Sequence, residues 1–126
     1  MLFQVIVYHD VARPLLASKP GWLKADAVHE VLQALSRLPA EGATNHALGL
    51  RAGLQLQPDD MYFLTDADDV SQEHLRLALQ LNTKNRTAIH TIELSLANRN
   101  HATMPMQVLA RLTHGTYQAV DLAKYR

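Results

Sequence analysis

The chain has 126 residues, 48% of them hydrophobic, which suits one globular domain of ordinary size. Its twelve basic and twelve acidic residues cancel, which argues against nucleic acid or an anionic membrane surface as a partner. The absence of cysteine excludes disulfides, thiolate metal sites and a cysteine nucleophile, and it fits a reducing compartment, so we expect a cytoplasmic location.

The first part of the chain predicts two strands and a helix. LFQVIVY (2–8) is apolar and β-branched almost throughout, the pattern of a strand that is buried on both faces inside a parallel sheet. ARPLL (12–16) contains Pro14, which lacks the N–H donor that a central strand needs, so a strand there belongs at a sheet edge. Residues 22–38 place apolar side chains at helical spacing and are followed by Pro39, which predicts an amphipathic helix with a stop.

Helices and strands alternate through the rest of the chain. Thr44 or Asn45 can cap a second helix, and Ser71 can cap a third. In order, we expect a helix ending before Pro58, a strand at 61–65, a helix at 71–82, a strand at 87–95, a polar loop at 96–105, a helix at 104–115 and a strand at 116–122. Such alternation implies right-handed crossovers, hence an α/β fold of three layers, a mostly parallel open sheet flanked by helices.

Hydropathy argues against a membrane span within this chain. No stretch approaches the ~20 consecutive apolar residues of a spanning helix. The first ten residues also lack the basic start and long apolar run of a signal peptide. We therefore expect one domain over residues 1–126 and no membrane partner.

Polar side chains gather where this architecture collects ligands. In open parallel sheets, ligands bind beyond the carboxyl ends of the strands, where successive loops meet. Three loops supply candidates there: His9 and Asp10 after the first strand, Thr44, Asn45 and His46 at the start of a helix, and Asp66, Asp68 and Asp69 after the strand at 61–65. Their chemistry is mostly hard oxygen, which suits Mg²⁺, Mn²⁺ or Ca²⁺ better than zinc.

The order of these segments resembles a von Willebrand factor A domain. GATNHALGLRAGLQLQPDDMYFLTDADD resembles the middle of such a domain, where a Gly-x-Thr loop precedes a helix and a strand closes on Leu-Thr-Asp. FQVIVYHDVARPLL resembles the second and third strands of that fold, and IHTIELS with VLARLTHGTYQAVDL resembles its last two strands and the helix between them. The resemblance covers essentially the whole chain.

The resemblance implies a metal-ion-dependent adhesion site, of which this chain carries a part. The family's second loop supplies a threonine, matched by Thr44, and its third supplies an aspartate, matched by Asp66. The ligand-rich Asp-x-Ser-x-Ser loop is missing from the sequence, which starts at what resembles the second strand, so we expect a fold without its first strand and first helix. Affinity for hard cations depends on the number and charge of the ligands, so Mg²⁺ or Mn²⁺ should bind weakly, and no cofactor is required.

Two functions from different classes follow. The first is a non-enzymatic protein-binding module whose contact surface, or binding crest, comprises His9, Asp10, Asn45, His46, Asp68 and Asp69, with a cation optional. The alternative is a metal-dependent glycosyltransferase-like enzyme, because Asp66 and Asp68 have the spacing of an Asp-x-Asp element that holds Mn²⁺ or Mg²⁺ on a nucleotide sugar. The short chain, without an early nucleotide-binding loop, favours the binding module.

Each candidate residue also has a structural explanation that needs no ligand. Thr44 and Asn45 are good helix caps, and Asp66 is favourable beside a positive helix terminus. Asp68 and Asp69 suit a solvated turn before a helix. Each of these residues can therefore be explained without a bound metal.

Finally, the apolar first strand predicts self-association. A strand as apolar as residues 2–8 needs cover on both faces, and an incomplete domain leaves part of that cover missing. A second copy could supply it. We therefore expect a homodimer whose interface includes the neighbourhood of the first strand and residues 11–16.

Overall fold

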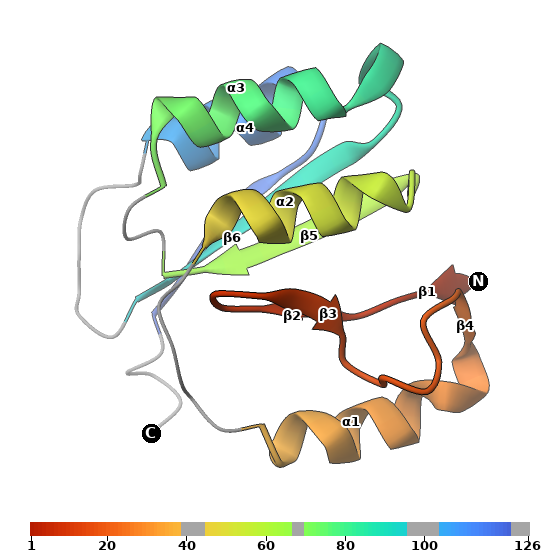
Figure 1. The fold of residues 1–126 in the computed structure, drawn as a ribbon. Coiled ribbons are helices and arrows are strands. Elements are labelled where there is room, and N and C mark those ends of the chain that lie inside the picture. Colours follow the sequence, from red (N-terminus) through yellow and green to blue (C-terminus); the bar gives the residue numbers. More distant parts are fainter. Residues whose placement is uncertain (39–44, 67–69, 96–103, 122–126) are drawn as a thin grey trace. The chain divides into compact units, whose positions relative to one another are not determined.

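The computed structural model describes residues 1–38, 45–66, 70–95 and 104–121. The chain divides into two compact units, Met1–Ala52 and Gly53–Arg126 (Figure 1). Helix α2 (His46–Gln55) begins in the first unit and ends in the second. The expectation of one domain over residues 1–126 stays a prediction.

The first unit is built from short antiparallel strand pairs and a helix. Strand β1 (Leu2–Phe3) pairs with β4 (Leu23–Lys24), and β2 (Ile6–Tyr8) pairs with β3 (Ala12–Pro14). A 3₁₀ turn, η1 (Ala25–Ala27), then leads into helix α1 (Val28–Ser36). Pro14 lies in β3, whose described pairing is with β2 alone, as expected for an edge strand.

Gln4 interrupts the strand that we expected over residues 2–8. Its side-chain amide donates to the carbonyls of Lys19 (3.0 Å) and Gly21 (2.6 Å), and its side-chain oxygen accepts from the Val5 N–H at 2.8 Å. These bonds take the place of ladder bonds, so the segment divides into β1 and β2. Because both pieces pair antiparallel and keep partly exposed side chains, the prediction of a parallel strand buried on both faces was wrong.

A small apolar cluster holds the first unit together. Its buried members are Leu15, Leu16, Leu23, Ala27 and Val31, and Phe3, Val5, Val7, Ala34 and Leu38 pack against them. The helix expected from residue 22 begins later, because Leu23 joins β4 and fills this cluster. Leu15 and Leu16 are 6% and 8% exposed, so they complete their own unit and are not available for the dimer contact that we assigned to them.

The second unit confirms the α/β class. Its elements are β5 (Asp60–Thr65), α3 (Gln72–Leu81), η2 (Thr83–Asn85), β6 (Ala88–Ser95), α4 (Met104–Leu112) and β7 (Tyr117–Asp121). The three strands form one parallel sheet in the order β5-β6-β7, so each helical connection returns the chain to the next strand. Ser71 begins α3 with a capping box, in which its N–H donates to Nδ1 of His74 at 3.1 Å.

Helices α3 and α4 lie side by side on one face of this sheet (Figure 1). Buried apolar side chains fill the layer between them and the strands: Phe63, Leu75, Ala78, Ile89, Met106, Leu109 and Ala110. Two buried threonines add directional bonds. Thr91 donates to the Met106 carbonyl at 2.8 Å, and the Thr113 hydroxyl accepts from the Ile89 N–H at 3.0 Å and donates to the Leu109 carbonyl at 2.9 Å. These bonds fix where α4 sits along β6.

Gly115 is required where α4 turns into β7. A Cβ added there would overlap the backbone carbonyl of Ile89, and neither backbone can move without disturbing the sheet. We therefore expect Gly115→Ala to destabilise the protein by more than the ~1–3 kcal/mol typical of overpacking. Gly21→Ala is the matched control, because a Cβ there meets no atom within 4 Å. Urea unfolding followed by circular dichroism measures both, and equal midpoints would contradict the prediction.

Thr113→Val tests the hydroxyl that joins α4 to β6. Valine keeps the shape but leaves the N–H of Ile89 buried without its acceptor, so we expect a loss of about 1–3 kcal/mol. The exposed Thr83 gives the control, since Thr83→Val should change stability by less than about 0.5 kcal/mol. Thermal unfolding compares the two variants, and a Thr113→Val midpoint at the wild-type value would refute the assignment.

Candidate functional site

The loop after β2 lies against the start of α2. The N–H of Asn45 donates to the carbonyl of His9 at 2.7 Å, and the N–H of His9 donates to the carbonyl of Val11 at 2.9 Å. The Asn45 side-chain oxygen accepts from the N–H of Leu48 at 3.2 Å, which makes Asn45 the N-cap of α2. Two of the three loops that we predicted are therefore tied together by backbone bonds within the first unit.

His9 and Asp10 present polar groups on this loop. Nδ1 of His9 contacts Oδ1 of Asp10, and the two side chains are 33% and 70% exposed. Asn45 is also exposed. The loop thus offers a carboxylate, an imidazole and a carboxamide to solvent.

His46 belongs to the interior instead. Its side chain is 1% exposed, and Nδ1 bonds to the Tyr8 hydroxyl at 3.0 Å. Tyr8 approaches α2 closely, since a Cβ at Gly49 would stand 2.7 Å from the Tyr8 ring. A contact residue needs an exposed side chain, so His46 positions β2 against α2 and does not form part of an exposed crest.

Asp66 lies in the second unit, directly after β5, with an exposed side chain. Thr44, Asp68 and Asp69 lie outside the described residues. Within the described ranges, no three His, Asp or Glu side chains gather closely enough to hold a metal ion. The expected weak cation binding through Asp66 and Thr44, and the Asp66 and Asp68 pair of the enzymatic alternative, stay predictions.

A buried carboxylate near the carboxyl end of β6 was missed in the sequence. Glu93 is 7% exposed and lies in register with Thr65 of β5, so the two side chains share the sheet face that α4 covers. The hydroxyl of Tyr117 is buried on the same face. Burial raises the pKa of Tyr117, and the negative charge of Glu93 raises it further. A charged residue inside a β-rich run was the signal that could have identified Glu93.

A second polar group crosses the amino ends of the three strands. Nε2 of His90 bonds to Oδ1 of Asp60 at 2.9 Å, and Nδ1 faces the Thr116 hydroxyl at 3.0 Å. Asp60, His90 and Thr116 have the residue types of an orienting acid, a base and a nucleophile, in that order. However, the backbone N–H of Thr116 also donates to Nδ1 at 3.1 Å, which engages the lone pair that a base would need. This group therefore ties β5, β6 and β7 together.

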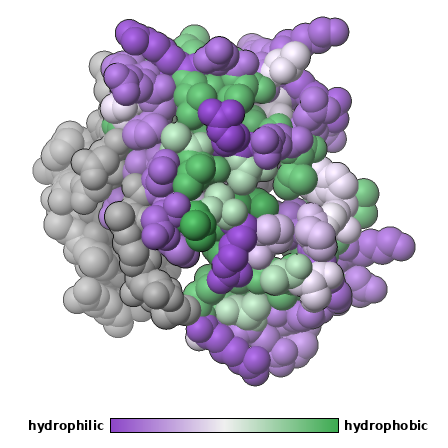
Figure 2. Space-filling model, viewed as in Figure 1, coloured by the Kyte–Doolittle hydropathy of each residue, from purple (hydrophilic) through white to green (hydrophobic). Residues whose placement is uncertain are grey.

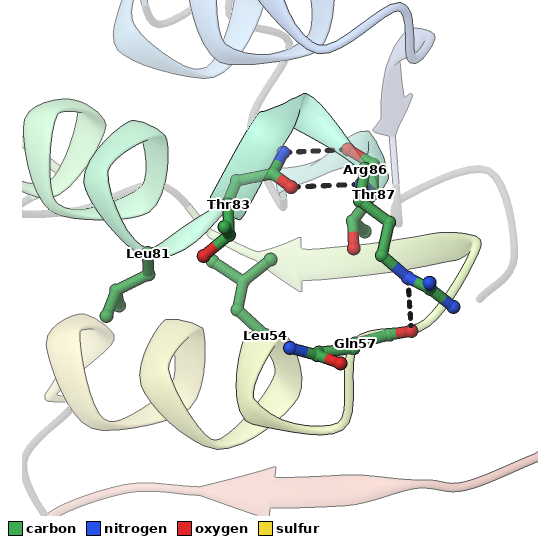
Figure 3. A pocket seen from close by; sticks show the side chains of 7 residues that line it. Leu54, Gln57, Leu81, Thr83, Arg86 and Thr87 are labelled. Carbon is green, nitrogen blue, oxygen red and sulfur yellow. Dashed lines mark hydrogen bonds between the residues drawn. The ribbon is translucent and has the colours of Figure 1, made fainter.

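The pocket in Figure 3 lies between the end of α2 and the loop before β6. Its lining residues are Leu54, Gln57, Leu81, Asn82, Thr83, Arg86 and Thr87. Two of its polar side chains are engaged with backbone: the Asn82 amide bonds to both backbone groups of Thr87, and Arg86 Nε donates to the Gln57 carbonyl at 3.0 Å. With a volume of about 20 Å³, the pocket has room for about one water molecule and none for a substrate.

The described helices are shorter than a membrane-spanning helix. None of them combines the length and the apolar character needed to cross a bilayer. The longest described helices, α2 and α3, have ten residues each. A spanning helix needs ~20.

Comparison with known proteins gives matches among solved structures. No model of a known protein family matches the sequence. No curated protein matches it either. Among solved structures, the chain is similar to a von Willebrand factor type A protein from Catenulispora acidiphila, with 18% identity and a TM-score of 0.75 over 94% of this chain. The match spans 29% of the length of that protein.

A second similar structure is an uncharacterized membrane spanning protein from Vibrio fischeri. It shares 16% identity over 98% of this chain and 72% of its own, but its TM-score of 0.41 is too low to support an argument. The first match agrees with the parallel sheet and flanking helices described above. The fold of this chain is therefore that of a von Willebrand factor type A domain.

Proposed function

We propose that this chain is a non-enzymatic protein-binding module of the von Willebrand A type. It contacts its partner through the described, exposed part of the expected crest, His9, Asp10 and Asn45. The observation that carries the proposal is the 2.7 Å bond from the Asn45 N–H to the His9 carbonyl, which joins the loop after β2 to the residue that begins α2. The likeness in fold to a von Willebrand factor type A protein supports it.

The crest is suited to recognition because its backbone is already ordered. Asn45 caps α2 through Leu48, and the His9 N–H is engaged with Val11, so the backbone at both residues is held before a partner binds. A surface that is fixed before binding loses less conformational entropy when the partner arrives.

The exposed chemistry of the crest favours a partner with hydrogen-bond donors or a cationic side chain. Asp10 supplies an acceptor that is 70% exposed, and His9 beside it supplies a second polar group. An arginine or lysine on the partner would pair with this carboxylate. Binding residues of this kind commonly lie on loops that a rigid scaffold positions, as α2 does here.

Site-specific crosslinking tests the proposal. A photoreactive residue at position 10 should capture a discrete partner, whereas the same residue at the exposed Glu73 on α3 should not. Asp10→Lys should reverse the local charge and reduce binding of the captured partner by at least about tenfold, roughly 1.4 kcal/mol. Equal capture from both positions, or undiminished binding by Asp10→Lys, would count against the crest.

A divalent cation should bind this chain at best weakly. Asp66 and Thr44 correspond to two ligands of the family's site, and affinity for Mg²⁺ or Mn²⁺ falls when charged ligands are few. Titration calorimetry with either ion should therefore show an affinity weaker than low micromolar. Asp26→Ala serves as a control for Asp66→Ala. A low-micromolar affinity that disappears only in Asp66→Ala would show that the site is complete and would contradict this prediction.

A further inference from the structure

Strand β5 is an edge strand of the second unit's sheet. Among the described residues its ladder partner is β6 alone. The N–H of Ala88 in β6 donates to the carbonyl of Asp59 at 2.9 Å, so the backbone groups of Asp59 face β6. Because successive residues of a strand direct their backbone groups to opposite sides, the N–H and C=O groups of Asp60, Tyr62 and Leu64 point away from β6. No backbone bond joins these groups to another described residue.

Within its own six residues, the strand has no sequence feature of the kind that protects an edge. Natural edge strands are shortened, bulged, or carry lysine or proline. Strand β5 is six residues long, its sequence DMYFLT contains no lysine, proline or glycine, and its register with β6 runs without a bulge. Its one charged side chain, Asp60, is bonded to His90. Nothing in the strand therefore opposes the addition of another strand.

Two large apolar side chains stand beside the unpaired backbone. Tyr62 is 64% exposed and Leu64 is 49% exposed. Figure 2 shows one face of the molecule, on which hydrophobic residues interrupt the polar surface. The register places Phe63 beside Thr91, which bonds to α4, so Tyr62 and Leu64 lie on the opposite face of the sheet. The Tyr62 ring stacks on His90 with centroids 4.7 Å apart, which holds it in a defined orientation.

We infer that β5 pairs antiparallel with β5 of a second copy of this chain, so that two three-stranded sheets join into one. The strand is complementary to itself in this arrangement, as a two-fold contact requires. With Tyr62 opposite Tyr62 of the second copy, Asp60 lies opposite Leu64, and every outward backbone group finds a partner. In the next register, Phe63 would lie opposite Phe63 of the second copy, and Asp60 would lie opposite Asp66. Like charges directly opposite each other are unfavourable, so the first register is preferred.

The charge of the whole chain is compatible with a second copy. Its formal net charge of +0 produces no net repulsion between copies, a condition that promotes association. The contact area is modest, because pairing six residues buries less than the ~800 Å² per partner of a standard interface. We therefore expect a reversible dimer that dissociates on dilution. The residues of this contact belong to the second unit, whereas the crest residues belong to the first.

Sedimentation equilibrium over a wide concentration range, with amide hydrogen exchange, tests the inference. The wild-type chain should dimerise, and Tyr62→Lys should weaken the dimer at least about tenfold, because it places two positive charges opposite each other. Leu32→Lys on α1 is the matched control, since Leu32 is 58% exposed and the added charge is the same. The amides of Tyr62 and Leu64 should exchange more slowly as the dimer forms.

Three results would overturn the inference: a monomer at every concentration, equal weakening by Leu32→Lys, or slow exchange of both amides that does not depend on concentration. The last would mean that the edge is covered within one chain. If Tyr62→Lys fails to fold, Leu64→Pro replaces it. Its missing N–H faces away from β6, so the internal ladder is kept while the outer edge is blocked.

Discussion

The arrangement of helix and strands in the second unit depends on the hydrogen bonds of the Thr113 hydroxyl. Strand β6 is central, and its Thr91 N–H bonds to the carbonyl of Thr116 at 2.8 Å. Two residues earlier, the Ile89 N–H faces the same side, but β7 begins at Tyr117 and supplies no partner there. The Thr113 hydroxyl takes that place at 3.0 Å, and by donating to Leu109 it attaches the end of α4 to the strand. One side chain thus replaces a missing strand residue and fixes the turn into β7.

Much of this architecture could be predicted from local patterns, because the helices and the parallel strands carry their own signals. Ser71 begins α3 as a cap should, and the apolar spacing located α2 and α4 to within a few residues. The first unit was harder to predict. There, a single glutamine divides an apolar run by bonding to backbone 15 and 17 residues away, and periodicity within a short window contains no sign of such a contact.

The site was predictable in outline and not in its individual side chains. The topology indicated that the loop after the first strand and the start of a helix would hold polar groups, and the bond from Asn45 to His9 joins them. Whether a histidine points inward is decided by distant partners. His46 is buried because Tyr8, 38 positions earlier, supplies a hydroxyl for it. Glu93 could have been noticed from its place in a β-rich run, but its burial depends on packing by a helix later in the chain.

The two ends of the parallel sheet use their polar groups differently. At the amino end, Asp60, His90 and Thr116 bond mainly to one another, and both donors of Thr116 converge on Nδ1 of His90. Groups engaged in this way hold the strands and have little capacity left for a ligand, so a catalytic interpretation of this triad is weak despite its residue types. The polar crest of the first unit and the edge of β5 in the second are the described surfaces to which we assign the two proposed contacts, and their residues can be mutated separately.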